Sequence, residues 1–141
     1  MIGKDFVGVD CEWRAFTGEG TNSTGAIAII QISSDTDAFL IDLIALAGSK
    51  VLDGVLCHVF LTSTVVGFSF DSDLDMLEKH CPKLNFYRQI TKLLDIQVYY
   101  KAVAGTEKNL GLAKVATELL GKEICKAERM SNWERRPLRM S

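Results

Sequence analysis

Apolar runs alternate with polar, turn-forming stretches along this chain, and their spacing predicts the order of strands and helices. Five strands are expected, at residues 5–13, 26–32, 38–43, 63–70 and 92–97. Helices are expected at 44–61, at 70–81, from the end of the fifth strand through 103, and at 109–121. A turn-rich loop, 17–25, separates the first two strands. The first three strands have short connections, which favours a meander, so the pattern predicts one α/β domain over residues 1–141 with a mixed sheet.

Composition and charge narrow the classes of protein that fit. The chain has 141 residues, of which 48% are hydrophobic, and its net charge is −2, so it can form a core but carries no overall basic surface for nucleic acid. Residues 1–120 are acidic and residues 121–141 are basic, an arrangement in which metal ions rather than lysines could meet phosphate. No apolar run reaches membrane-spanning length. Four scattered cysteines indicate reduced thiols in a cytoplasmic or nuclear protein: Cys11, Cys57, Cys81 and Cys125.

Two acidic residues stand in the first predicted strand, within VGVDCEW. Asp10 and Glu12 are two positions apart, and side chains at that spacing point to the same face of a strand. Two carboxylates beside apolar neighbours repel each other unless a cation or a proton offsets their charge. The pair therefore indicates a divalent metal site, although the spacing alone leaves open that both acids simply lie at a strand end.

A third acid is selected by helical geometry in VGFSFDSDLDML. On the helix predicted for 70–81, Phe70, Leu74, Leu77 and Cys81 form one apolar stripe, and Asp73 borders it at roughly 60°. The other acids of this helix lie on the opposite flank. Asp73 is therefore the acid of this helix that is expected to face the sheet, with a solvated helix acid as the alternative.

These residues resemble a known family. VGVDCEW, a buried strand ending in IIQIS, VGFSFDSDLDML and the tail ending in SNWERRPL are similar, in this order, to the DEDD 3′–5′ exonucleases, which include RNase D, and most of all to Nibbler-type (mut-7 homologue) exonuclease domains. The resemblance covers nearly the whole chain. It implies an RNase H-like fold and metal-dependent hydrolysis of the terminal phosphodiester at the 3′ end of a single-stranded nucleic acid, with RNA favoured over DNA.

The same resemblance implies roles for individual residues. Asp10, Glu12 and Asp73 would be catalytic residues and ligands of two Mg²⁺ or Mn²⁺ ions, with Asp10 bridging both, Glu12 on the ion that carries the attacking water, and Asp73 on the second ion. Trp13, Phe68 and Phe70 would lie near the terminal nucleotide and stack on it. For Trp13, packing of the ring over the strand is an equally open interpretation.

The chain departs from the family pattern at its C-terminal end. The third motif, a Tyr followed four residues later by an Asp on a final helix, does not occur before the last residue, Ser141. A truncated domain with an incomplete active site is therefore expected. The alternative function is a catalytically inactive nucleic-acid-binding or protein-interaction module that keeps the fold, and an endonuclease is a third, weaker one.

Several polar residues outside these motifs receive structural interpretations. Asp42 and Asp95 follow apolar strands and are expected to cap helices. Trp133 is expected to anchor the tail in the core. Four arginines of the tail form either a phosphate-binding strip or, the slightly favoured interpretation, a solvated tail: Arg129, Arg135, Arg136 and Arg139.

Overall fold

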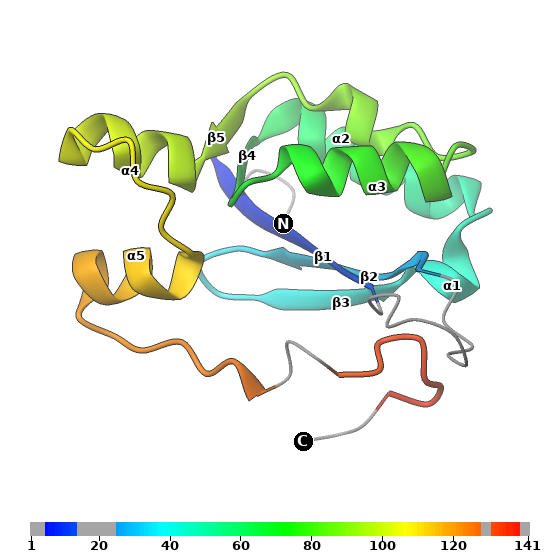
Figure 1. The fold of residues 1–141 in the computed structure, drawn as a ribbon. Helices are drawn as coiled ribbons and strands as arrows, with labels where there is room; N and C mark the ends of the chain where they lie inside the picture. The colour runs from blue at the N-terminus through cyan, green and yellow to red at the C-terminus, as the bar shows by residue number, and fades with distance from the viewer. Residues whose placement is uncertain (1–4, 14–24, 128–130, 139–141) are drawn as a thin grey trace.

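The sheet of this protein has five strands in the residues described by the computed structural model, which are 5–13, 25–127 and 131–138 (Figure 1). The strand order is β3-β2-β1-β4-β5; β1, β2 and β3 pair antiparallel, whereas β4 runs parallel to β1, and β5 parallel to β4. The predicted mixed α/β sheet with an initial meander is confirmed. The strands are β1 (Phe6–Trp13), β2 (Ile27–Ser33), β3 (Ala38–Asp42), β4 (Thr64–Gly67) and β5 (Leu93–Asp95).

The helices largely follow the sequence pattern, with differences at their ends. The segment predicted as one helix at 44–61 is two helices, because Ser49 accepts a hydrogen bond from the Leu52 backbone N–H at 3.2 Å and starts a new one. A short 3₁₀ helix, η1 (Phe86–Gln89), was not predicted. The others are α1 (Leu43–Leu46), α2 (Lys50–Thr62), α3 (Asp71–His80), α4 (Ile96–Ala104) and α5 (Leu112–Leu120). None of the helices within the described ranges is long and apolar enough to cross a membrane.

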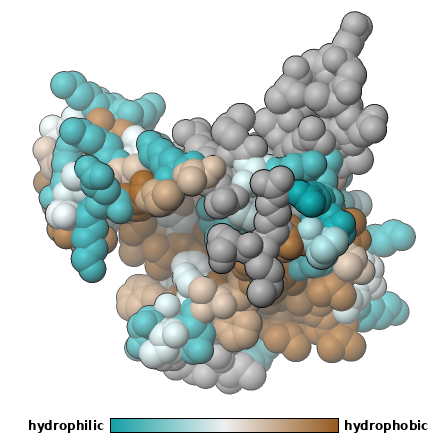
Figure 2. Space-filling view, turned by 90° about the horizontal axis from the view of Figure 1, so that it is seen from below, coloured by the Kyte–Doolittle hydropathy of each residue, from teal (hydrophilic) through white to brown (hydrophobic). Residues whose placement is uncertain are grey.

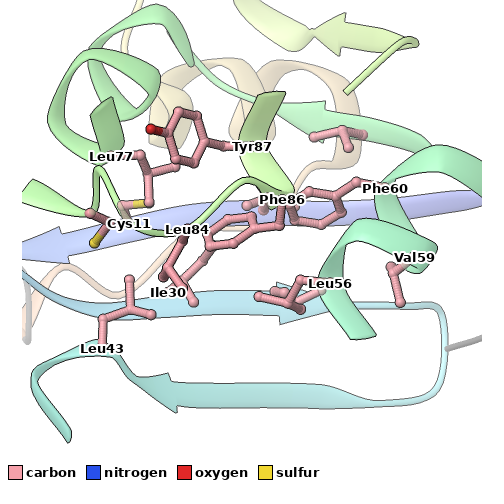
Figure 3. Packing of buried hydrophobic residues seen from close by; sticks show 14 of the residues in the cluster. Cys11, Ile30, Leu43, Leu56, Val59, Phe60, Leu77, Leu84, Phe86 and Tyr87 are labelled. Carbon is pink, nitrogen blue, oxygen red and sulfur yellow. The ribbon is translucent and has the colours of Figure 1, made fainter. Parts of the chain in front are cut away.

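The main hydrophobic core lies between one face of the sheet and the helices α2 and α3 (Figure 1). Side chains alternate along β1, so Val7, Val9 and Cys11 point into this core. Phe60 of α2 meets Phe86 of η1 edge to face, with ring centroids 5.5 Å apart (Figure 3). The even-numbered residues of β1, which include both predicted metal ligands of that strand, therefore point to the opposite face of the sheet.

The predicted capping acids are confirmed. Asp42 caps α1 by accepting from the Ala45 backbone N–H at 3.1 Å, and Asp95 caps α4 by accepting from the N–H groups of Gln97 and Val98. The predicted loop at 17–25 lies outside the described residues, apart from Gly25.

Residues 131–138 are fixed to the sheet by Arg136. Its guanidinium donates to the Asp42 carboxylate, with Nη2–Oδ1 at 2.6 Å, to the Ala28 carbonyl oxygen at 3.3 Å and to the Trp133 carbonyl oxygen at 2.7 Å. Arg136 is exposed, as Arg135 is, but its guanidinium is engaged with the sheet, so Arg136 is not a free phosphate ligand. Trp133, expected in the core, is half-buried and lies outside the main core cluster. Arg129 and Arg139 lie outside the described residues.

Candidate active site

Asp73 and Asp10 meet where α3 begins beside β1. Strand β4 pairs with β1 only over Phe6–Gly8, so amide groups farther along β1 need other partners. The Cys11 backbone N–H donates to Asp73 Oδ1 at 3.0 Å. Asp73 is only 5% exposed, which confirms the prediction that it faces the sheet. Because Cys11 directly follows Asp10, this hydrogen bond brings the two carboxyl groups to the same part of the sheet.

The turn between β4 and α3 positions Asp73. The Asp95 carboxylate accepts from the Phe70 backbone N–H at 2.9 Å, and the Ser69 hydroxyl donates to Gln97 Oε1 at 2.9 Å. Ser69 has a φ of 53°, which a residue with a side chain rarely adopts. Strained backbone of this kind persists where neighbouring contacts hold it, and here Asp95 and Gln97 supply those contacts. The junction between β5 and α4 therefore determines where the first turn of α3 lies.

The electrostatics of the two carboxyl groups favour a bound cation. Removal from water and, next in size, the negative charge of Asp10 together raise the pKa of Asp73 to about 6, against the hydrogen bonding from Cys11 that lowers it. Asp10 is open to solvent on one side, yet the surrounding sheet displaces enough water to raise its pKa as well. A cation beside both groups would relieve these costs, and Mg²⁺ or Mn²⁺ prefers such oxygen donors.

Cys11, although it lies between the acids in sequence, is chemically inert. Burial raises the pKa of its thiol far above the ordinary value, and the charges of Asp73 and Asp10 raise it further. The thiol therefore stays protonated and serves as a core residue rather than as a nucleophile or a soft metal ligand. Cys57, Cys81 and Cys125 are also free thiols.

Glu12 is held by a residue that the sequence pattern did not single out. Its Oε1 accepts a hydrogen bond from Gln31 Nε2 of β2 at 3.1 Å. Within the described ranges, no three His, Cys, Asp or Glu side chains are grouped closely enough to hold one metal ion. The structure thus brings Asp10 and Asp73 together and leaves Glu12 engaged with Gln31. The signal that could have identified Gln31 is an amide in the otherwise apolar run IAIIQI.

An open pocket of about 260 Å³ lies on the acid-bearing face of the sheet. Asp10 and Gln31 line its polar part, and Phe68 supplies an aromatic ring next to apolar side chains such as Leu40 and Leu112. Seen from below, the molecule shows hydrophobic surface gathered over part of this side (Figure 2). The pocket has the mixture of aromatic rings, apolar walls and a few polar groups that suits a small ligand or a nucleoside.

Two of the predicted stacking residues are placed differently from the expectation. Phe70 has 0% of its side chain exposed and belongs to the core, so its ring cannot stack on a nucleotide. The reason is a close approach to β4: a Cβ added to Gly67 would lie 2.7 Å from the Phe70 ring. Trp13 packs against the core and does not line the pocket, which favours the packing interpretation of its ring.

The known proteins that are similar in sequence to this chain are described as exonucleases. Residues 3–141 match the sequence pattern of a family described as 3′-5′ exonuclease. The exonuclease mut-7 homologue of Aedes aegypti is 27% identical over 153 residues, which cover 96% of this chain and 21% of that protein. Its human counterpart is 25% identical over 151 residues, covering 94% and 17%. The chain thus spans about a fifth of the curated relatives that it matches.

Solved structures show the same fold. The exonuclease domain of Aedes aegypti Nibbler superposes with a TM-score of 0.73 at 20% identity, over 98% of this chain and 69% of that one. Escherichia coli RNase D gives a TM-score of 0.73 at 20% identity, over 96% and 33%. These likenesses confirm the RNase H-like arrangement expected from the motifs. With a family pattern that extends over nearly every residue and a fold that matches, the chain belongs to the 3′-5′ exonuclease family.

Proposed function

We propose that this chain is a divalent-metal-dependent 3′–5′ exonuclease domain that acts on single-stranded nucleic acid, with RNA preferred over DNA. The observation that carries the proposal is the meeting of Asp10 and Asp73 at the Cys11 amide, in a chain of this family. Both carboxyl groups have raised pKa values in the metal-free protein. A site in which two acids are kept close together at such a cost is suited to a cation.

The proposed metal ligands are Asp10, Glu12 and Asp73. Mg²⁺ keeps several of its waters and needs few protein carboxylates, so Asp10 and Asp73 form a sufficient starting set, and Glu12 follows Asp10 two positions later on the same face of β1. Two bound ions would supply an activated water and would stabilise the leaving 3′ oxygen. The protein's own contribution is to hold three carboxylates on one rigid strand and one helix end.

The pocket beside Asp10 is the proposed site for the terminal nucleoside. Phe68 offers a ring for base stacking, which tolerates any base, and Leu40 and Leu112 extend the apolar wall. Binding of this kind selects the end of a strand by shape rather than by reading base edges. It also suits a chain with a net charge of −2, since few basic side chains would be needed beyond the metal ions.

The preference for RNA is supported by what related proteins bind. RNase D of Trypanosoma brucei, with a TM-score of 0.69 and 21% identity to this chain, has been solved in complex with RNA U12, and E. coli RNase D is described as an exoribonuclease. We therefore expect single-stranded RNA to be the better substrate. The four free thiols favour a reducing cytoplasmic or nuclear setting.

The proposal is tested by a time course with Mn²⁺ on 5′-labelled single-stranded RNA and on DNA of the same sequence. We expect products that shorten one nucleotide at a time, faster on RNA. Cleavage should be absent with EDTA and in an Asp10→Asn variant. The exposed helix acid provides the matched control, Asp75→Asn, which should retain activity.

The outcomes separate the candidate functions. Fragments cut in the interior of the RNA would contradict an exonuclease and favour an endonuclease. RNA binding that survives both EDTA and Asp10→Asn, without any cleavage, would favour the alternative of a non-catalytic binding module. No cleavage and no RNA binding would leave only a role in protein interaction.

A further inference from the structure

Gln31 occupies an unusual position in β2. It is the one polar residue in Ile27–Ile32, where its neighbours are fully buried. It lies directly opposite Asp10 in the antiparallel pairing of β1 and β2, so both side chains point to the same face. Gln31 also lines the pocket next to Asp10. Removing an amide side chain from water within an apolar strand costs free energy unless a hydrogen bond compensates for it.

The hydrogen bond that Gln31 makes is to a proposed metal ligand. Its Nε2 donates to Glu12 Oε1 at 3.1 Å, across the diagonal of the strand pair, since Glu12 itself is opposite Ile29. A glutamine amide can donate without changing charge, so the contact is available with or without a cation.

Glu12 needs such a restraint more than Asp10 does. A glutamate side chain has more rotatable bonds than an aspartate, and the negative charge of Asp10, two residues away on the same face, repels it. A donor on the neighbouring strand opposes the tendency of Glu12 to turn away into solvent, which side-chain entropy and this repulsion both favour. Gln31 offers that donor from the neighbouring strand, directly opposite Asp10.

The geometry points to Gln31 as a positioning residue that holds the Glu12 carboxylate beside Asp10 and so lowers the cost of assembling the acids around a divalent cation. This inference rests on the proposed metal-dependent function. Residues that orient metal ligands commonly change metal affinity by about 10- to 100-fold when they are replaced. In this role Gln31 acts on the cation through Glu12 and not by binding it.

The test measures Mn²⁺ affinity of the 141-residue chain by isothermal titration calorimetry, with the melting temperature in EDTA measured in parallel. Gln31→Met keeps the size of the side chain and removes the donor, and Gln31→Asn keeps the amide but shortens its reach. We expect both variants to bind Mn²⁺ about 10-fold more weakly while the melting temperature in EDTA changes little. Gln89→Met makes the same change of side chain outside the pocket and should leave Mn²⁺ affinity unchanged.

A double-mutant cycle identifies the route of the effect. If Gln31 acts through Glu12, Gln31→Met should have no further effect on Mn²⁺ affinity in a Glu12→Gln background. If the wild type binds Mn²⁺ and Gln31→Met binds it with an affinity within twofold of the wild type, this inference alone is overturned. Full additivity of the two substitutions would also overturn it. No Mn²⁺ binding by the wild type would overturn the proposed metal site together with this inference.

Discussion

Replacing Asp73 by Asn should stabilise the metal-free protein at alkaline pH, although Asp73 is a proposed metal ligand. The substitution removes a negative charge that folding takes out of water beside Asp10. It keeps a side-chain oxygen that can accept the Cys11 backbone N–H, as Asp73 Oδ1 does at 3.0 Å. We therefore expect the substitution to raise the stability of the metal-free protein and to weaken metal binding, because the charge of Asp73 is unfavourable until a cation binds.

The size of the effect follows from the pKa of Asp73. Its ordinary value of 3.8 is raised to about 6 in the folded protein, so the neutral carboxyl favours folding below about pH 4, and this contribution is lost as the pH rises through about 6. A shift of roughly two units corresponds to about 3 kcal/mol at pH 8. The buried NH₂ group of Asn needs a partner and offsets about 1 kcal/mol of that gain. We expect the variant to be about 1–3 kcal/mol more stable at pH 8 and about 1 kcal/mol less stable near pH 4, where only the cost of the NH₂ group remains.

The assay is urea unfolding in EDTA at both pH values for the wild type, Asp73→Asn and the control Asp75→Asn, whose acid is exposed on the same helix. The control should show no comparable pH-dependent gain. A variant no more stable than the wild type at pH 8, or equally stabilised at both pH values, would refute the reasoning. With Mn²⁺ in excess the order should reverse, because the wild type gains stability from the bound ion and the variant gains less.

Four further substitutions test the fold and the pocket. Asp53→Ala removes the acceptor for the backbone N–H groups of Asn85, at 2.6 Å, and Phe86, at 2.9 Å, and should lower the free energy of unfolding by about 1–3 kcal/mol in urea titrations. Phe70→Ala should lower it by about 3–5 kcal/mol because the ring is fully buried, whereas Phe68→Ala should cost far less and should instead weaken RNA binding in a fluorescence anisotropy titration. Arg136→Gln, which loses its paired contacts with the Asp42 carboxylate, should lower the melting temperature by several degrees; no change would mean that the tail needs no such anchor.

The orientation of Asp73 was predictable because helical periodicity constrains it strongly. The apolar residues of α3 define its packed side, and an acid at the border of that stripe has to face the sheet or the solvent beside it. The same stripe contained Phe70, which the structure buries. The helical pattern therefore predicted correctly that Phe70 is packed, whereas the stacking role taken from the family resemblance does not fit a fully buried ring.

Other features were harder to predict because they depend on contacts between distant segments. The turn after β4 ends the strand at Gly67, three residues earlier than predicted, since Asp95 and Gln97 from farther along the chain hold it. The break before α2 was visible in the residues Gly48 and Ser49, where Ser49 is a strong N-cap. The bond between Gln31 and Glu12 requires the strand register, which periodicity alone does not supply.

The mixed pairing of β1 has a consequence for how the domain folds. Strand β1 can pair with β2 soon after both are made, but its parallel pairing with β4 and the contact of Asp73 with Cys11, 62 residues apart, require closure of long loops. We therefore expect the hairpin of β1 and β2 to form early and the two carboxyl groups to meet late. The repulsion between these groups then arises only after the rate-limiting step of folding. A bound divalent ion would therefore mainly slow unfolding and would leave the folding rate nearly unchanged.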